Sequence, residues 1–285
     1  MIKKNRLILF FLLLAFQLAA RNKGHLVIIG GGDVPDAIRQ KIIEFAGGER
    51  ADMMVVPYAS DDPQDSGTYN VDIFKKLGCG RIDWLVLDPN SVNSDEVLAK
   101  LKTTTGIYFS GGDQSRLTKL MLNTRVLARI REIYENGGVI GGTSAGAAIM
   151  SKIMITGNEL INKDADNPFK TIQAGNVETV EGFGFIDRVI IDQHFIARRR
   201  QNRLISLQLA NPELLCVGID EATAIVVNPD GTFDVLGEGS VLVYDASHAK
   251  NIKLNQKGYY GVEKMITHIL VAGDRFNIRK RAVLE

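Results

Sequence analysis

The sequence predicts a doubly wound α/β fold, with a mostly parallel sheet and an antiparallel extension. In the first half of the chain, short and continuously apolar runs alternate with helical stretches, which is typical of a parallel sheet covered by helices on both faces. In the second half, apolar runs follow one another closely with turn residues between them, which indicates antiparallel strands. The chain has 285 residues, 45% hydrophobic and 24% charged, as is ordinary for a globular protein with a sizeable core.

The first twenty residues differ in character from the rest of the chain. They begin with three basic residues, Lys3, Lys4 and Arg6. An apolar run over 7–14 follows, and small residues end the segment, as in a secretory signal peptide. Because this run is shorter than the ~20 residues of a membrane span, an uncleaved anchor is the less favoured alternative. We therefore expect a leader over 1–20 and a secreted or periplasmic protein, with no stable membrane association after cleavage.

The remaining chain, residues 21–285, is expected to form one α/β domain, because no linker rich in Pro, Gly or Ser interrupts it. Predicted strands cover residues 26–29, 53–56, part of 77–87, 106–109, 189–191, 216–219, 224–227 and 240–243. Helical spacing of apolar residues predicts helices over 36–45 and 116–135. The run Asn228-Pro229-Asp230-Gly231 predicts the turn of a hairpin.

A corner of small residues surrounds one serine in the run Gly141-Gly142-Thr143-Ser144-Ala145-Gly146. A predicted strand enters this corner and a helix follows, which is the arrangement of a nucleophile elbow. The glycines would let strand and helix pack closely while the serine backbone is held in a strained turn. The N–H of Ala145 would then be one donor of an oxyanion hole. Taken alone, the motif also fits a tight turn that only binds an anion.

A second glycine motif, Ser110-Gly111-Gly112-Asp113-Gln114, also follows a predicted strand and opens a helix. Ligands bind at the carboxyl ends of the strands in a doubly wound sheet, so both motifs should face the same crevice. The N–H of Gly112 is the candidate for the second oxyanion donor. Gln114 is a candidate to hydrogen-bond a substrate amide or carboxylate. The alternative is a plain glycine turn with Asp113 as helix N-cap.

A serine nucleophile needs a base, and the chain has four histidines. They are His25, His194, His248 and His268. His194 alone lies at a strand end beside other polar groups, so elimination leaves it as the candidate base. An acid must orient its imidazole, and three residues are candidates. They are Glu221, Asp192 and Glu159, and the sequence spacing does not choose among them.

Four arginines follow the candidate base closely: Arg198, Arg199, Arg200 and Arg203. Guanidinium groups bind carboxylates in a bidentate manner, so their position favours a pocket for an acidic substrate group over a solvated helix face. Net charge is +1, so no overall field favours nucleic acid or an anionic membrane, and we expect no nucleic-acid partner.

The sequence indicates neither a metal nor an organic cofactor. No spacing of cysteine or histidine is typical of a metal site. The glycines of Gly30-Gly31-Gly32 lack the spacing of a dinucleotide fingerprint, and a close backbone approach around the site explains them better. Cys79 and Cys216 are expected as small core residues. A symmetric homodimer, the commonest assembly, is the expected state.

Several blocks occur in a fixed order along almost the whole chain after the leader. They are Phe-Ser-Gly-Gly-Asp-Gln (109–114), Gly-Gly-Thr-Ser-Ala-Gly-Ala (141–147), Asp-Gln-His-Phe (192–195) followed by spaced arginines, Gly-Ile-Asp-Glu-Ala-Thr-Ala (218–224) and Val-Ala-Gly-Asp-Arg-Phe (271–276). Together they resemble the cyanophycinase family, within a group of serine peptidases that includes aspartyl dipeptidases. The resemblance implies a fold similar to class I glutamine amidotransferases, with a flavodoxin-like architecture.

The resemblance also implies a substrate and a set of roles. Cyanophycin is a poly-aspartate chain with arginine on each side-chain carboxyl, and its peptidases release β-aspartyl-arginine dipeptides. Carried over by motif, Ser144 is the nucleophile that forms an acyl-enzyme, His194 the base and Glu221 the orienting acid. The implied substrate contacts are Gln114, Gln193, Arg198, Arg200 and Arg203.

Two other functions use the same residues. An exopeptidase for short aspartyl or other β-linked peptides would keep the catalytic groups and change the pocket. Arg199, Gln201 and Asn202 depart from the small or apolar residues expected between the family's arginines, which bears on that pocket. A non-catalytic binder of acidic polymers would need only the arginines, but the presence of all three catalytic residue types favours an enzyme.

Overall fold

The computed structural model describes residues 23–163 and 166–285. The predicted leader over 1–20 lies outside these residues. Within the described ranges, no helix is both long and apolar enough to cross a membrane.

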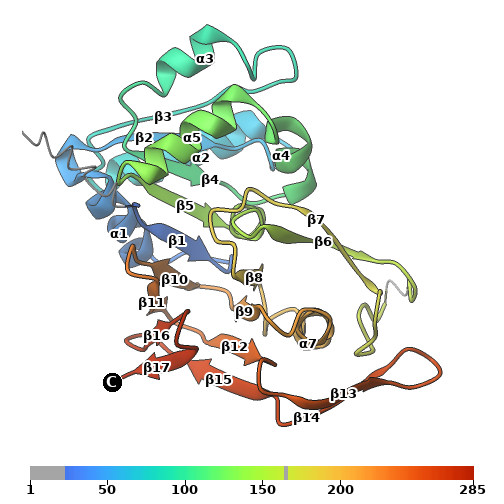
Figure 1. Ribbon diagram of the computed structural model, residues 1–285. Coiled ribbons are helices and arrows are strands. Elements are labelled where there is room, and N and C mark those ends of the chain that lie inside the picture. Colours follow the sequence, from blue (N-terminus) through green and yellow to red (C-terminus); the bar gives the residue numbers. More distant parts are fainter. Residues whose placement is uncertain (1–22, 164–165) are drawn as a thin grey trace, which may run out of the picture.

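A nine-stranded sheet forms the centre of the molecule (Figure 1), in the order β17-β16-β11-β10-β1-β5-β4-β2-β3. Five of its strands are parallel to one another. They are β1 (Leu26–Ile29), β2 (Asp52–Val56), β3 (Arg81–Trp84), β4 (Gly106–Phe109) and β5 (Val139–Thr143). All but β3 are buried along almost their whole length, which explains why the sequence shows unbroken apolar runs there.

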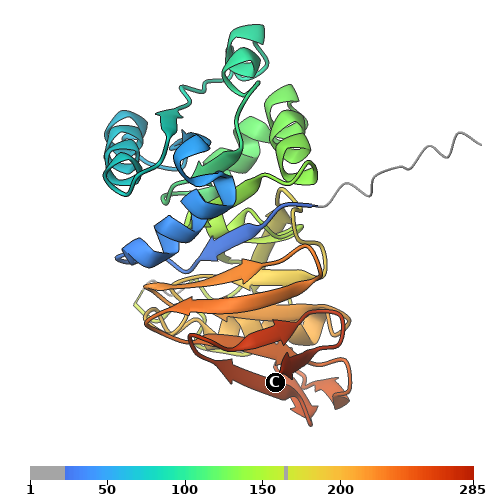
Figure 2. The same cartoon turned by 90° about the vertical axis from the view of Figure 1, so that its left-hand side faces the viewer.

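Helices cover both faces of the parallel strands (Figure 2), as a doubly wound fold requires. Alternate residues of β1 show the two layers, because Val27 and Ile29 pack in one buried cluster and Leu26 and Ile28 in the other. The first cluster includes apolar side chains of α1 (Asp36–Ala46) and α2 (Pro63–Lys76). The second includes those of α3 (Asp95–Lys100), α4 (Gln114–Met121), α5 (Arg125–Glu135) and α6 (Ala145–Ala148).

The predicted helix over 116–135 is wrong as a single element, because the chain breaks between α4 and α5. Asn123 has a φ of 62°, and the Thr124 hydroxyl accepts a hydrogen bond from the N–H of Leu127, which caps α5. Both helices turn their apolar residues to the same buried cluster, so the apolar spacing continues across the break.

Antiparallel strands extend the sheet beyond β1, as predicted for residues 224–227. They are β10 (Thr223–Val227), β11 (Thr232–Gly237), β16 (Arg275–Asn277) and β17 (Ala282–Leu284). The predicted hairpin turn joins β10 to β11, where Gly231 has a φ of 80° and its N–H donates to the carbonyl of Asn228 at 3.0 Å.

The predicted strands around 189–191, 216–219 and 240–243 do not join that sheet. They form a separate sheet in the order β15-β12-β9-β8. Its strands are β8 (Val189–Asp192), β9 (Leu215–Ile219), β12 (Val241–Asp245) and β15 (Ile266–Leu270), with β8 parallel to β9. Helix α7 (Gln201–Ala210) packs against this second sheet (Figure 1).

Two separate ribbons and a short turn complete the described chain. The ribbons pair β6 (Ile153–Glu159) with β7 (Val177–Glu181), and β13 (Lys250–Leu254) with β14 (Tyr260–Glu263). The short 3₁₀ helix η1 (Gly48–Arg50) follows α1. Cys79 and Cys216 are buried and form no disulfide, as expected for core residues.

Candidate active site

The loop after β1 joins the two sheets at the carboxyl ends of their strands. The Ile29 carbonyl accepts from the N–H of Ser144 at 3.0 Å, and the Gly30 carbonyl accepts from the N–H of His194 at 2.8 Å. The Gly31 carbonyl accepts from the N–H of Ala222 at 2.9 Å. Three successive carbonyls therefore hold the segments that follow β5, β8 and β9 around one point.

Ser144 occupies a sharp turn between β5 and α6. Its backbone has φ 53° and ψ −108°, a conformation that is costly for a residue with a side chain. A Cβ at Gly142 would lie 2.4 Å from the carbonyl oxygen of Gly146, and one at Gly146 would lie 2.3 Å from that of Phe109. Only glycines therefore allow β4, β5 and α6 to approach as closely as this turn requires.

His194 lies against Ser144, two residues beyond β8. Its Nε2 is 2.9 Å from the Ser144 Oγ, and the side chain is almost fully buried. A Cβ at Gly31 would lie 2.3 Å from the imidazole Cε1, and Gly31 has a φ of 112°. The backbone at Gly31 thus approaches the imidazole closely, as expected for this run of glycines, and the approach leaves no room for a side chain.

Glu221 completes a chain of three linked side chains. Its Oε1 lies 2.5 Å from the His194 Nδ1, on the far side of the imidazole from Ser144. A Cβ at Gly32 would lie 2.8 Å from the Cβ of Glu221, so this glycine gives the carboxylate its room.

The other two candidate acids are placed elsewhere. Asp192 accepts two hydrogen bonds from the Arg203 guanidinium, at 2.7 Å from Nε and 2.5 Å from Nη2. Glu159 accepts from the Asn176 side chain at 2.7 Å, on the ribbon of β6 and β7. Of the three, Glu221 is the one that contacts the imidazole.

Burial keeps the imidazole neutral. It lowers the pKa of His194 below its usual 6.5, and the nearby Arg198 and Arg200 lower it further, while Glu221 acts in the opposite direction. A neutral imidazole whose Nδ1–H donates to Glu221 presents an acceptor at Nε2 to the Ser144 hydroxyl. The arrangement is therefore able to withdraw the serine proton at neutral pH.

Two backbone N–H groups beside Ser144 are available as donors. Within the described ranges, neither the N–H of Ala145 nor that of Gly112 has a hydrogen-bond partner. Ala145 begins α6 directly after Ser144. Gly112 has a φ of 135°, and a Cβ there would lie 2.0 Å from the carbonyl oxygen of Ala59. Gly111 is close enough to Ser144 that its own Cβ would lie 3.4 Å from that of Ser144.

The two glutamines that were candidates for substrate contact are both buried. The Gln114 amide donates to the carbonyls of Ile155 and Thr156, at 2.9 and 2.8 Å, so its N–H groups tie α4 to β6. The Oε1 of Gln193 is buried without a partner among the described residues. Of the two side chains, Gln193 thus has the unsatisfied polar atom.

The arginines after His194 differ in what they contact. Arg198 is exposed, with its Nε 4.0 Å from the Glu221 Oε1. Arg200 is mostly buried and donates to the carbonyl of Gln193 at 2.7 Å, and burial lowers its pKa to about 10. Arg203 does not fit the expected substrate contact, because its side chain is only 4% exposed and its guanidinium is paired with Asp192. It therefore presents no free guanidinium to a substrate.

Asp220 is a further residue of the site that the sequence reasoning missed. Its Oδ1 accepts from the N–H groups of Ile196 and Ala197, at 3.0 Å each. It thereby fixes the turn that leads from His194 to the arginines. Its position next to Glu221 at a strand end was the available signal.

The described part of the chain contains no group of three or more His, Cys, Asp or Glu side chains arranged to hold a metal ion.

Comparisons with known proteins identify the family of the chain. The model of peptidase family S51 matches residues 26–235. A cyanophycinase of Synechococcus elongatus is 36% identical over 273 residues, covering 92% of this chain and 81% of that protein. A cyanophycinase of Trichormus variabilis is 34% identical over 270 residues, covering 92% and 88%.

A solved structure shares the fold. A peptidase from an acI-B1 Actinobacterium superimposes with a TM-score of 0.65 at 22% identity, covering 90% of this chain and 98% of that one. The family model and the relatives extend over the segments that carry Ser144, His194 and Glu221. The chain therefore belongs to peptidase family S51 and is a serine-type peptidase.

Proposed function

We propose that this peptidase hydrolyses cyanophycin, multi-L-arginyl-poly-L-aspartate, to β-aspartyl-arginine dipeptides, with Ser144, His194 and Glu221 as its catalytic triad. The observation that carries the proposal is the unbroken chain from the Ser144 Oγ through the imidazole to Glu221, at 2.9 and 2.5 Å. The substrate follows from the relatives named cyanophycinase.

The proposed reaction is acyl transfer in two steps. The Ser144 Oγ attacks the aspartyl carbonyl carbon while the His194 Nε2 takes the hydroxyl proton. The N–H groups of Gly112 and Ala145 stabilise the oxyanion. The C–N bond then breaks and the imidazolium gives its proton to the leaving amine. Water, deprotonated by the same imidazole, attacks the acyl-enzyme and releases the acid.

Charge complementarity supports an acidic substrate. Arg198 is exposed beside Glu221. Burial lowers the pKa of Arg200 to about 10, so this guanidinium keeps its charge at neutral pH. We propose that these two arginines contact carboxyl groups of the substrate. The buried Oε1 of Gln193 would accept a hydrogen bond from a substrate N–H group. Gln114 would contact the substrate through its side-chain carbonyl oxygen, since its N–H groups donate to carbonyls of the protein.

The place of action is proposed from the sequence. A leader over 1–20 would export the domain formed by residues 21–285, and the enzyme would then attack polymer released by other cells.

An exopeptidase for short β-linked peptides is the second candidate. It is favoured by one observation, the pairing of Arg203 with Asp192, which removes one arginine from the surface offered to a polymer.

The test is product analysis. The chain is incubated with purified cyanophycin, and the soluble products are identified by mass spectrometry, with Ser144→Ala as control. We expect β-aspartyl-arginine from the native protein and none from the variant. Equal release by the variant would contradict Ser144 as nucleophile. Cleavage of short β-aspartyl peptides in preference to the polymer would support the exopeptidase. Labelling of Ser144 by a fluorophosphonate probe would exclude a non-catalytic binder.

A further inference from the structure

A polar cavity of about 290 Å³ adjoins the active site and has no part in the mechanism above. It lies between the loop after β1, helix α2 and the ends of β4 and β5. Its volume is close to the lower limit of small-molecule sites, ~300 Å³.

The cavity shares its wall with the catalytic groups. Thr143 and Gly111 line it, and these residues respectively precede Ser144 and lie directly against it. Gly32, which also lines it, packs against Glu221. The cavity therefore lies within reach of a group attached to the residue whose carbonyl is at Ser144.

The lining of the cavity includes a buried cation. Arg39 is 9% exposed, and its Nη1 donates to the Val34 carbonyl and lies 3.3 Å from the Asp36 carboxylate. Its Nε is buried and has no partner among the described residues. A buried charged donor without a partner is costly, so a ligand with an acceptor group would stabilise the Arg39 Nε.

The rim of the cavity carries the opposite charge. Asp33 comes from the loop after β1 and Asp65 from the first turn of α2, and both are exposed. Within the described ranges, neither carboxylate forms an ion pair with a basic side chain. Tyr69 lines the same rim and is 58% exposed, so its ring is free to contact a planar cation. Two carboxylates and an aromatic ring are suited to a guanidinium.

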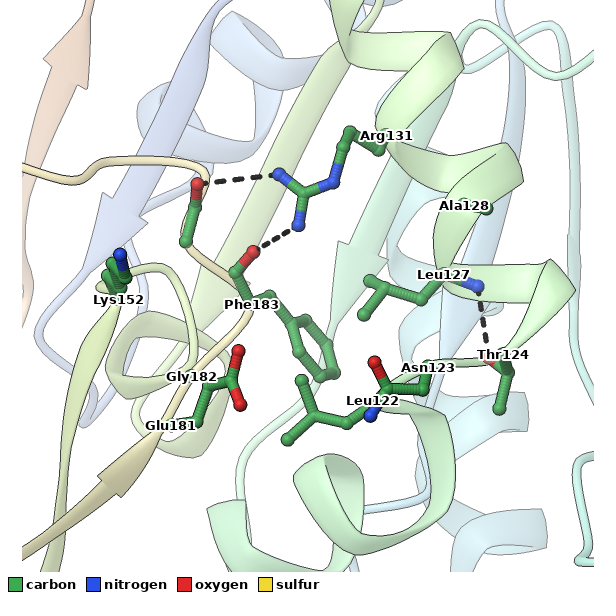
Figure 3. A pocket seen from close by; sticks show the side chains of 11 residues that line it. Leu122, Asn123, Thr124, Leu127, Ala128, Arg131, Lys152, Glu181, Gly182 and Phe183 are labelled. Carbon is green, nitrogen blue, oxygen red and sulfur yellow. Dashed lines mark hydrogen bonds between the residues drawn. The ribbon is translucent and has the colours of Figure 1, made fainter.

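Within the described residues, another cavity neither adjoins the catalytic groups nor is lined by a buried cation with an unpartnered donor. The cavity of about 340 Å³ in Figure 3 lies beside α5 and the chain after β7. Its Arg131 donates to the carbonyls of Phe183 and Gly184, so that cation is already used by the fold (Figure 3). None of the residues that line it contacts Ser144, His194 or Glu221 through a hydrogen bond in the described part of the chain.

We infer that the cavity beside Ser144 is the subsite for the β-linked arginine of the aspartyl residue under attack. The guanidinium lies between Asp33 and Asp65, and the arginine α-carboxylate faces Arg39. This inference rests on the proposed function, because it assumes that an aspartyl carbonyl is presented to Ser144. It assigns the selectivity for arginine to the loop after β1 and to α2, and not to the arginines that follow His194.

The test compares two synthetic aspartyl peptides that differ in one group. One carries β-linked arginine and the other β-linked citrulline, which has the same shape without the charge. The double variant Asp33→Asn/Asp65→Asn is assayed beside the native protein. The control is Asp72→Asn, an exposed acid of α2 outside the cavity. We expect the native protein and the control to prefer arginine by about tenfold to a hundredfold in kcat/KM, and the double variant to lose that preference.

The contact between Arg39 and the substrate carboxylate is tested by changing the substrate, because Arg39 also forms hydrogen bonds within the protein. Amidation of the arginine α-carboxyl should lower kcat/KM by about tenfold or more in the native protein. An unchanged kcat/KM would overturn the assignment of Arg39.

A binding measurement separates this inference from the proposed function. The inactive variant Ser144→Ala is titrated calorimetrically with both peptides, with and without the double substitution. Binding that prefers arginine and depends on Asp33 and Asp65 supports the subsite even if no peptide is hydrolysed, in which case the proposed function alone fails. Hydrolysis of both peptides at equal rates, or a preference that survives the double substitution, overturns the subsite and leaves the proposed function intact.

Discussion

At the scale of single residues, the site depends on conformations that only particular side chains tolerate. Ser144 and His194 have φ values of 53° and 47°, and both are held there by hydrogen bonds from their N–H groups to the last residue of β1 and the residue after it. Because the reacting atoms are presented by this strained backbone, removing a side chain should affect chemistry far more than folding.

Ser144→Ala provides the first prediction. The variant keeps a Cβ and the same backbone, so its melting temperature should change little. It lacks the hydroxyl, so kcat should fall by about 10⁴-fold or more. Circular dichroism and the rate of dipeptide release measure the two effects. A variant that retains a tenth of the native rate would exclude Ser144 as nucleophile.

Gly31→Ala tests the close approach of the loop to the imidazole. The new Cβ would lie 2.3 Å from the His194 ring, so the ring must move away from Ser144. We expect kcat/KM to fall by about 10²-fold, as a displacement of about 1 Å in a catalytic group can cause. Gly157→Ala is the matched control, because Gly157 has a similar φ of 102° but nothing within 4 Å of its added Cβ. Equal losses in both variants would show that backbone strain, and not the imidazole, is responsible.

The pH dependence is a further prediction at this scale. The base must be neutral, so kcat/KM should fall as pH decreases through the pKa of His194, with a midpoint below 6.5 because burial lowers that pKa. Arg198→Gln removes a cation that contributes to the lowering, so the midpoint should move to higher pH. The exposed neighbour Arg199 supplies the control, Arg199→Gln. A midpoint that stays unchanged in Arg198→Gln would contradict this account.

The sequence was sufficient for some of these residues and insufficient for others. Small residues around Ser144 and a histidine at a strand end are local patterns, so both could be predicted. The acid could not be selected from spacing, because Asp192 would lie on the same side as His194 if the strand continued. The chain instead turns at His194, and Asp192 points to Arg203. That choice depends on α7, which no local pattern places.

At the scale of elements, a buried ion pair connects β8 to α7. Asp192 and Arg203 are 1% and 4% exposed in their side chains, and the guanidinium lies 5.3 Å from the ring centroid of Phe169. The pair therefore fixes the position of the strand that carries His194. Breaking such a pair leaves a buried charge without its partner.

Asp192→Asn should lower the free energy of unfolding by about 3–5 kcal/mol, since it leaves Arg203 buried with a neutral partner. The control is Asp61→Asn, which removes an exposed pair with Arg116 at 2.7 Å and should cost at most about 1 kcal/mol. Chemical denaturation measures both. Similar losses in the two variants would show that the buried pair does not stabilise the junction.

The positions of the strands were easier to predict than the strands with which they pair. Apolar runs located β1, β4 and β5 because these strands are buried on both faces. The same kind of run located β8 and β9, but their hydrogen-bonded neighbours in the second sheet are set by contacts with the loop after β1 and with α7. Long-range packing of this kind leaves no period in the sequence.

At the scale of the whole molecule, the first strand limits where the chain can be shortened. β1 begins at Leu26 and lies between β10 and β5, in the interior of the nine-stranded sheet. Its loss would separate the parallel strands from the antiparallel ones and would remove the carbonyls that hold Ser144 and His194. A leader cleaved near residue 20 would leave β1 complete.

The last prediction follows from that position. When the full chain is produced in a bacterial host, we expect mature protein outside the cytoplasm, with a new N-terminus close to residue 21. Mass spectrometry of the purified protein gives the N-terminus, and cell fractionation gives the location. The matched control begins at residue 21 behind a start methionine, and it should fold, retain the peptidase activity and stay in the cytoplasm. Recovery of the full chain in the membrane fraction, with residues 1–20 intact, would instead identify the segment as an anchor.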